Sequence, residues 1–139
     1  MKRILIVCTG NSARSQMAEA FIKHMTFNRV NAVSAGTKPA PVNPYAIRVM
    51  KEIGIDISKN RSKSVSEFQN DGFDYVITVC NDARENCPVF RGSHTKIHKS
   101  FEDPVRIKGN DKIKLEAFRK IRDEINDWLV EFIERYQIV

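Results

Sequence analysis

The sequence has no apolar run near the roughly 18 residues that a membrane-spanning helix requires. At its start, Lys2-Arg3 is followed by only four strongly apolar residues, fewer than the ~7–15 of a secretory signal. These absences argue against a membrane protein and against a secreted one. We therefore predict a cytoplasmic protein.

Cysteine is also scarce, and its count is odd. Three cysteines do not form a simple disulfide framework, and the spacing Cys8…Cys80-x6-Cys87 matches no tetrahedral zinc site, with no histidine pair to complete one. In the cytosol, cysteines are kept reduced and their disulfides are mostly transient and catalytic. The thiols are therefore candidates for chemistry.

No dense block of positive charge and no regular aromatic interleaving accompanies the net charge of +6 and the pI near 9.4. Lys and Arg are instead spread from Lys2 to Arg135. We therefore predict no nucleic-acid binding, which relies on basic patches and stacking platforms. A general attraction for small oxyanions fits the charge better.

No repeat, linker or low-complexity run divides the 139 residues, and a hydrophobic content of 42% is enough for one core. We predict a single domain over 1–139, working as a monomer. The proline-rich stretch 38–44 is interpreted as one surface loop.

Strand and helix patterns alternate along the chain. The β-branched run Ile4–Val7 is typical of a strand buried on both faces. Further strands are predicted at 31–35, 75–79 and 95–98. A first helix is predicted over 18–25, and a second begins at the Asn43 cap, with Ile47, Met50 and Ile53 facing inward. A short third helix begins at the capping box Ser64-x-x-Glu67, and a long fourth begins at Asp111. This order predicts an α/β fold, a four-stranded parallel sheet with helices on both faces, whose ligands bind at the carboxyl ends of the strands.

The first such end carries the loop Cys8-Thr9-Gly10-Asn11-Ser12-Ala13-Arg14-Ser15. Backbone N–H groups of such a loop and the positive end of the following helix dipole converge on one point, where a tetrahedral oxyanion fits. Gly10 and Asn11 tolerate unusual backbone angles, and the Arg14 guanidinium can donate two hydrogen bonds to the anion. The same field is expected to stabilise a Cys8 thiolate and lower its pKa, with Ser15 donating to the sulfur.

The run from Val7 to Ser15 resembles the anion loop of the low-molecular-weight protein tyrosine phosphatase superfamily. The continuations Gln16-Met17-Ala18-Glu19 and Ser34-Ala35-Gly36-Thr37 are similar to its thioredoxin-coupled arsenate reductase branch. The resemblance spans nearly the whole chain. Ala13 departs from relatives that carry an additional cysteine there, which a three-thiol scheme does not need.

Cys80 ends the third predicted strand, so topology places it at the same sheet edge as Cys8. If residues 80 to 87 are helical when reduced, a rise of 1.5 Å per residue separates the ends by about 10.5 Å. A disulfide needs Cα atoms within about 4.4–6.8 Å. We therefore predict that a Cys80–Cys87 disulfide unwinds this segment and moves Cys87 outward.

Asp103-Pro104 follows the fourth strand, and the proline fixes the loop that presents the carboxyl group. The resemblance implies that Asp103 is the general acid that protonates the leaving oxygen. Phosphatase relatives usually continue with aromatic residues that hold a phenyl ring, whereas this chain continues with Val105-Arg106. A small inorganic anion is therefore the expected ligand.

The resemblance implies that arsenate is reduced to arsenite through Cys8, Cys80 and Cys87 in turn, with thioredoxin reducing the final disulfide and no organic cofactor. It also suggests a potassium ion at Asn11, Glu19 and Ser34, although Lys63 stands where relatives place a further carboxylate. Two alternatives remain open. One is a phosphatase using Cys8, Arg14 and Asp103; the other is a non-catalytic oxyanion or redox sensor, which would retain its ligand in an Asp103→Asn variant.

Overall fold

A computed structural model describes residues 1–92 and 94–139. Four parallel strands form one sheet in the order β2-β1-β3-β4. Their bounds are β1 Arg3–Cys8, β2 Asn31–Gly36, β3 Tyr75–Thr78 and β4 Thr95–His98. The predicted parallel α/β sheet is confirmed, and β1 lies in its interior between β2 and β3.

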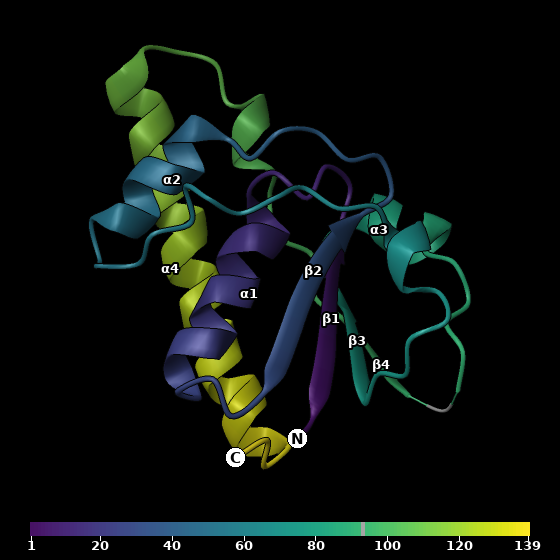
Figure 1. The fold of residues 1–139 in the computed structure, drawn as a ribbon. Helices are drawn as coiled ribbons and strands as arrows, with labels where there is room; N and C mark the ends of the chain where they lie inside the picture. Colours follow the sequence, from purple (N-terminus) through teal and green to yellow (C-terminus); the bar gives the residue numbers. More distant parts are fainter. Residues whose placement is uncertain (93) are drawn as a thin grey trace.

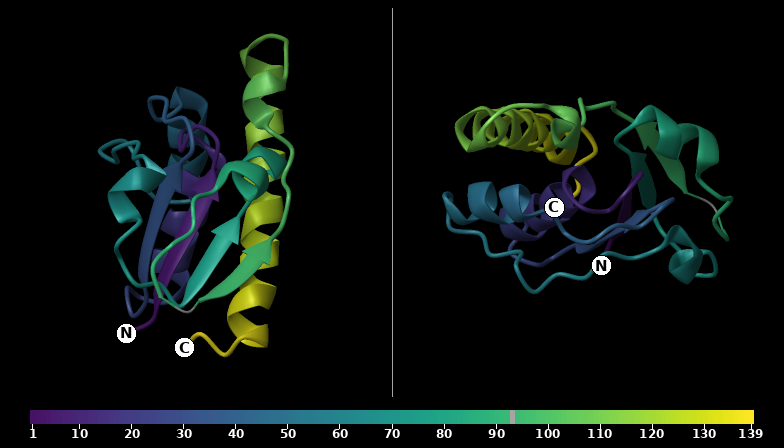
Figure 2. Two further views of the ribbon diagram at one scale, coloured as in Figure 1. Left: turned by 90° about the vertical axis from the view of Figure 1, so that its right-hand side faces the viewer. Right: turned by 90° about the horizontal axis from the view of Figure 1, so that it is seen from above.

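In the described part of the chain, four α-helices accompany the sheet, with bounds α1 Arg14–Met25, α2 Pro44–Lys51, α3 Asn81–Asn86 and α4 Asp111–Arg135. Short 3-10 turns cover Val65–Phe68 and Pro104–Arg106. Helices α1, α2 and α4 gather on one side of the sheet, whereas α3 lies on the other (Figures 1 and 2). No helix within the described residues is long and apolar enough to cross a membrane.

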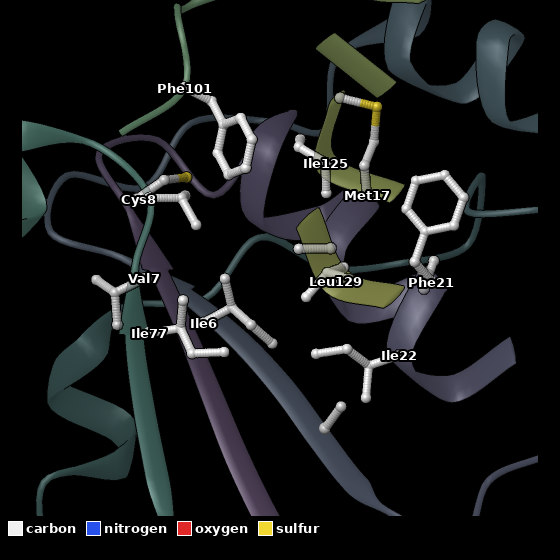
Figure 3. Packing of buried hydrophobic residues seen from close by; sticks show 14 of the residues in the cluster. Ile6, Val7, Cys8, Met17, Phe21, Ile22, Ile77, Phe101, Ile125 and Leu129 are labelled. Carbon is white, nitrogen blue, oxygen red and sulfur yellow. The ribbon is translucent and has the colours of Figure 1, made fainter. Parts of the chain in front are cut away.

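The core forms between β1, α1 and α4, where Ile6, Met17, Ile22, Ile125 and Leu129 lie together (Figure 3). The apolar run of β1 is fully buried, as its sequence predicts. The buried stripe of α4 takes every third or fourth position: Leu115, Phe118, Ile121, Ile125, Leu129 and Phe132. This core fixes β1 and α1, and therefore the loop between them.

Helix α2 begins as predicted, with the Asn43 side chain accepting from the Tyr45 amide and Pro44 in the first turn. The expected inward face is wrong at Ile53, which is 42% exposed. The helix ends at Lys51, so Ile53 no longer follows the helical period, and Ala46 and Val49 are buried beside Met50 instead.

Glu52 joins the end of α2 to α4, because its carboxylate accepts from Arg119 at 2.6 Å and from Arg122 at 2.9 Å. These arginines hold the pKa of Glu52 at about 2. Because the pKa of Glu52 is lower in the folded than in the unfolded protein, the ionised carboxylate stabilises the fold at pH values above the unfolded-state pKa of about 4.5. This stabilisation is lost as the pH falls toward 2. Since a third of the side chain is exposed, water screens the pair.

We therefore expect Glu52→Gln to lower the free energy of unfolding at pH 7 by about 1 kcal/mol. The difference from wild type is expected to shrink steadily between pH 4.5 and pH 2.5, as measured by urea unfolding. Glu134→Gln, at an exposed position of α4, is the control and is expected to change little. A Glu52→Gln deficit that stays constant down to pH 2.5 would contradict the ion-pair explanation.

Candidate active site

The carboxyl edge of the sheet carries the loop that links β1 to α1. Strand β1 ends at Cys8 and α1 begins at Arg14, so the predicted anion loop lies at the predicted edge (Figure 1). Ala13 caps the helix without a side-chain hydrogen bond, which leaves the first turn of α1 uncapped by any carboxylate or hydroxyl. The positive end of α1 is therefore available to a bound anion.

The Cys8 thiol lies at the base of this loop and is 2% exposed. Its sulfur is 2.8 Å from Ser15 Oγ and accepts from the Asn11 amide at 3.2 Å. Burial raises the pKa of Cys8, and the contacts with Ser15, Arg14 and Asn11 oppose this only in part. The expected net lowering of the Cys8 pKa is therefore wrong, because desolvation of the thiolate outweighs the surrounding dipoles.

The loop carbonyls point outward, and the segment 37–43 holds them there. Cys8 O, Thr9 O, Gly10 O and Ser12 O accept from the amides of Thr37, Lys38, Ala40 and Asn43 at 2.8–3.1 Å. In a planar trans peptide the N–H points opposite to the preceding C=O. The following amides therefore point inward, and the Asn11 amide, which donates to Cys8 Sγ, is one of them. The loop thus forms the expected nest for an oxyanion.

The unusual backbone angle of the loop falls on Asn11, whose φ is +48°, and not on Gly10. Asparagine is among the residues that tolerate the left-handed region best. The glycine that the loop requires is Gly36 at the end of β2, because a Cβ there would lie 2.5 Å from Thr9 O and 2.9 Å from Asn11 N. Any larger residue at position 36 would displace the loop.

The segment 37–43 thus acts as a first strap over the loop, and residues 60–64 form a second strap that holds Asn11. The Lys63 amide donates to Asn11 Oδ1 at 2.9 Å, and the Ser62 hydroxyl donates to Gly10 O at 3.0 Å. Gln16 donates to Asn11 Oδ1 and to Arg61 O, both at 3.0 Å. In turn, Asn11 Nδ2 donates to Ser15 Oγ, which contacts Cys8. The strap therefore orients the hydroxyl beside the sulfur.

Arg14 connects the anion loop with the loop that carries Asp103. Its guanidinium donates to Phe101 O at 3.0 Å and lies 3.5 Å from Asp103 Oδ2. Asp103 caps the turn at Pro104 through the Val105 amide, which fixes the carboxyl group. The structure thus brings Arg14 and Asp103 together, as the sequence predicts.

These residues line a pocket of about 440 Å³, formed by Thr9, Arg14, Cys80, Asn81, Asp82, Ser100, Phe101, Glu102, Asp103 and Arg106. Cys8 lies directly before Thr9 in the chain, and its side chain belongs to the same buried cluster as Phe101 (Figure 3). The opening is therefore shared by the anion loop, by Cys80 and by the carboxyl group of Asp103.

Cys80 is the residue before α3, and its sulfur accepts from the Ala83 amide at 3.4 Å. The same sulfur lies 3.3 Å from Thr9 Oγ1, so the second thiol reaches the anion loop as predicted. Cys87 is at the other end of α3, and all three thiols are free. Only 81–86 are helical, and Cys80 and Cys87 flank the helix in extended conformations. The unwinding on disulfide formation therefore stays a prediction.

Cys87 lines a separate pocket of mixed character, whose other lining residues are Val76, Thr78, Arg84, Pro88, Phe90, Lys96, Ile97 and His98. Burial there raises the pKa of Cys87 to about 11, although Lys96 lowers it slightly. At neutral pH Cys87 is therefore a protonated, weakly nucleophilic thiol as long as α3 stays wound.

The residues suggested for potassium already have donors. Glu19 accepts from Ser34 at 2.8 Å and from Lys23 at 2.9 Å, and Lys63 Nζ lies 3.8 Å from the oxygen that Ser34 contacts. Two ammonium groups neutralise the carboxylate and repel a further cation, so this set does not fit potassium. No group of three His, Cys, Asp or Glu side chains within 1–92 and 94–139 has metal-binding geometry.

Several supporting residues escape sequence reasoning. The straps 37–43 and 60–64 act largely through main-chain atoms, which leave no signature in residue type. The Asp82 carboxylate accepts hydrogen bonds from Thr9 and Thr37, and nothing in the sequence pattern singled out this residue. Gly36 was visible as a glycine at a strand end, although its close approach to Thr9 was not.

Comparison with known proteins agrees with this geometry. The chain matches the family described as low molecular weight phosphotyrosine protein phosphatase over residues 3–137. Arsenate reductase 1 of Staphylococcus epidermidis is 43% identical over 134 residues, 96% of this chain and 97% of that protein. A solved arsenate reductase in the oxidized state aligns over 97% of this chain and 98% of its own, with a TM-score of 0.83 and 32% identity.

A thioredoxin-dependent arsenate reductase of Corynebacterium glutamicum aligns over 98% of this chain and 63% of its own, with a TM-score of 0.68 and 30% identity. The family match covers β1 to the end of α4, including every residue of the anion loop. This chain therefore belongs to the low molecular weight phosphotyrosine protein phosphatase family.

Proposed function

We propose that this protein reduces arsenate to arsenite by passing electrons through Cys8, Cys80 and Cys87. The observation that carries the proposal is the placement of Cys80, 3.3 Å from Thr9 of the anion loop, with Cys87 at the other end of the same short helix. Phosphate-ester hydrolysis needs neither of these two thiols. The curated relatives that the chain resembles over its whole length are arsenate reductases.

Arsenate binds in the nest, held by inward amides of the loop and by the Arg14 fork. The Cys8 sulfur attacks arsenic as a thiolate, its proton having passed to solvent or to an arsenate oxygen. An As–S bond forms, an As–O bond breaks, and the hydroxyl leaves as water with a proton from Asp103. The bound anion also faces Ser15 and the start of α1, whose positive field stabilises its charge.

Cys80 then attacks the Cys8 sulfur. The S–S bond forms, the As–S bond breaks with its electron pair staying on arsenic, and arsenite departs; arsenic is reduced by two electrons and the two sulfurs are oxidised. Cys87 next attacks Cys80, which gives the Cys80–Cys87 disulfide and returns Cys8 as a thiolate. Because α3 must unwind for this step, Cys87 leaves its pocket and the disulfide moves toward the surface.

A dithiol protein of the thioredoxin class reduces the final disulfide; the relative from Corynebacterium glutamicum is described as thioredoxin-dependent. The reductant fits a cytosolic location, where the three thiols are kept reduced between turnovers. The relay is complete within one chain, so a monomer suffices, and no organic cofactor enters it.

The direct test is arsenate-dependent NADPH oxidation with thioredoxin and thioredoxin reductase. Wild type is expected to turn over, and a Cys80→Ser variant to show only background oxidation. If Cys80→Ser retains the wild-type rate, or if arsenate supports no oxidation while an aryl phosphate is hydrolysed rapidly, the reductase proposal is wrong. Slow aryl phosphate hydrolysis by both proteins is expected, since Cys8, Arg14 and Asp103 serve that reaction as well.

A further inference from the structure

The hydroxyl of Thr9 has one proton and two acceptors. Thr9 Oγ1 lies 3.3 Å from Cys80 Sγ and 3.3 Å from Asp82 Oδ2. A hydroxyl can donate to only one of them at a time. A neutral Cys80 thiol can itself donate to Thr9 and leave the proton for Asp82, whereas a Cys80 thiolate can only accept it.

Asp82 is well placed to retain that proton. The same oxygen, Oδ2, accepts from Thr37 Oγ1 at 2.9 Å, and Oδ1 accepts from Asn86 Nδ2 at 2.9 Å. The hydrogen bond from Thr37, followed by those from Thr9 and Asn86, lowers the pKa of Asp82, so it is an anion at neutral pH. Asp82 thereby ties α3 to the anion loop and to the strap 37–43.

We propose that Asp82 is a positioning residue that competes with the Cys80 sulfur for the Thr9 proton, and so restrains the nucleophilicity of Cys80 while holding α3 wound. The inference rests on the proposed role of Cys80 as the second thiol. In the resting protein the Thr9 proton stays on the Asp82 side. Deprotonation of Cys80 draws the Thr9 proton away from Asp82 and so removes one tie on α3, the helix that the next step must unwind.

Other charged groups surround this pair and stay constant in the comparison of variants. They are Arg14 at the start of α1, Glu102, Asp103 and Arg106 in the loop after β4, and Lys38 beyond β2. Arg84 and Glu85 follow Asp82 within α3 itself.

The test uses a protein in which Cys80 is the sole cysteine, made by Cys8→Ser with Cys87→Ser, with and without Asp82→Asn. The rate of alkylation by iodoacetamide is measured against pH. Asp82→Asn preserves size and shape but is a weaker acceptor, so the profile is expected to move about 0.5–1 pH unit lower, a three- to tenfold faster reaction at pH 7. An unchanged profile would overturn the proposal.

Two further variants separate the proton competition from simpler causes. Thr37→Val loosens the tie between α3 and the strap but leaves Asp82 as a competitor, so amide-exchange protection of 81–86 is expected to fall without a shift to lower pH. Thr9→Val removes the contested proton, and Asp82→Asn is then expected to shift the profile no further. If Thr37→Val shifts it as Asp82→Asn does, loosening is the cause. If Asp82→Asn still shifts the profile in the Thr9→Val background, the cause is the lost negative charge of Asp82. Either result would overturn the proton competition.

This assay needs no arsenate, so its outcome is independent of the proposed function. Turnover of Cys80→Ser decides whether Cys80 is the second thiol. The alkylation profiles decide whether Asp82 controls it.

Discussion

Cys87→Ser is expected to release one equivalent of arsenite per protein and then stop. The first two steps need only Cys8 and Cys80, both of which border the anion loop. Without the third thiol, no group in the protein attacks the Cys8–Cys80 disulfide. An external reductant cannot reach it either, because Cys8 is only 2% exposed. Multiple turnover with thioredoxin is expected to fall at least a hundredfold, whereas the single-turnover burst keeps its amplitude.

The measurement is quenched-flow determination of arsenite, followed by peptide mapping of the stopped protein for a Cys8–Cys80 disulfide. Cys8→Ser serves as the matched control and is expected to release no arsenite even in the first turnover. Sustained turnover of Cys87→Ser at the wild-type rate would show that thioredoxin attacks the first disulfide directly and that Cys87 is dispensable.

Arg14→Lys is expected to lower kcat/KM for arsenate by about a hundredfold to a thousandfold, the usual loss for one preorganised oxyanion donor. The planar guanidinium of Arg14 uses one nitrogen to donate to Phe101 O and another to pair with Asp103. An ammonium group is a single flexible point of charge and cannot keep this geometry while donating two bonds to the anion. The loss is therefore expected although the charge is conserved.

Arg106→Lys is the matched control for this variant. Arg106 also faces Asp103, at 3.9 Å, but its side chain is 87% exposed, so water screens the pair. We expect kcat/KM to change less than threefold in Arg106→Lys, with thermal unfolding of both variants measured alongside. Equal losses in the two variants would mean that general positive charge near Asp103, and not the fork at Arg14, governs the reaction.

The sheet could be predicted from the sequence because its signals are local. The run Ile4–Val7 is apolar on both faces, and the Asn43 cap lies where a helix begins. The site followed from the fold, because Cys8 ends β1, Cys80 lies just after β3, and these two parallel strands pair with each other. Reactive residues at the ends of strands can be predicted to lie together whenever the strands themselves can be predicted.

Interactions that depend on tertiary approach could not be predicted in this way. The outward carbonyls of the anion loop are held by amides of 37–43, and an amide is the same at every residue type. Nor does the sequence give the balance at Cys8, where the field of α1 favours the thiolate and burial opposes it. The ion pair between Lys63 and Glu19 could not be predicted either, because the two residues are 44 positions apart in the sequence.

The most direct test of the three-thiol relay is a single turnover of wild-type protein. Fully reduced protein is mixed with one equivalent of arsenate without any reductant, arsenite is quantified, and the thiols are mapped by alkylation and peptide mass analysis. We predict one equivalent of arsenite, a Cys80–Cys87 disulfide and a free Cys8. Arsenate left unreduced with all three thiols free would contradict the account and leave a phosphatase in its place.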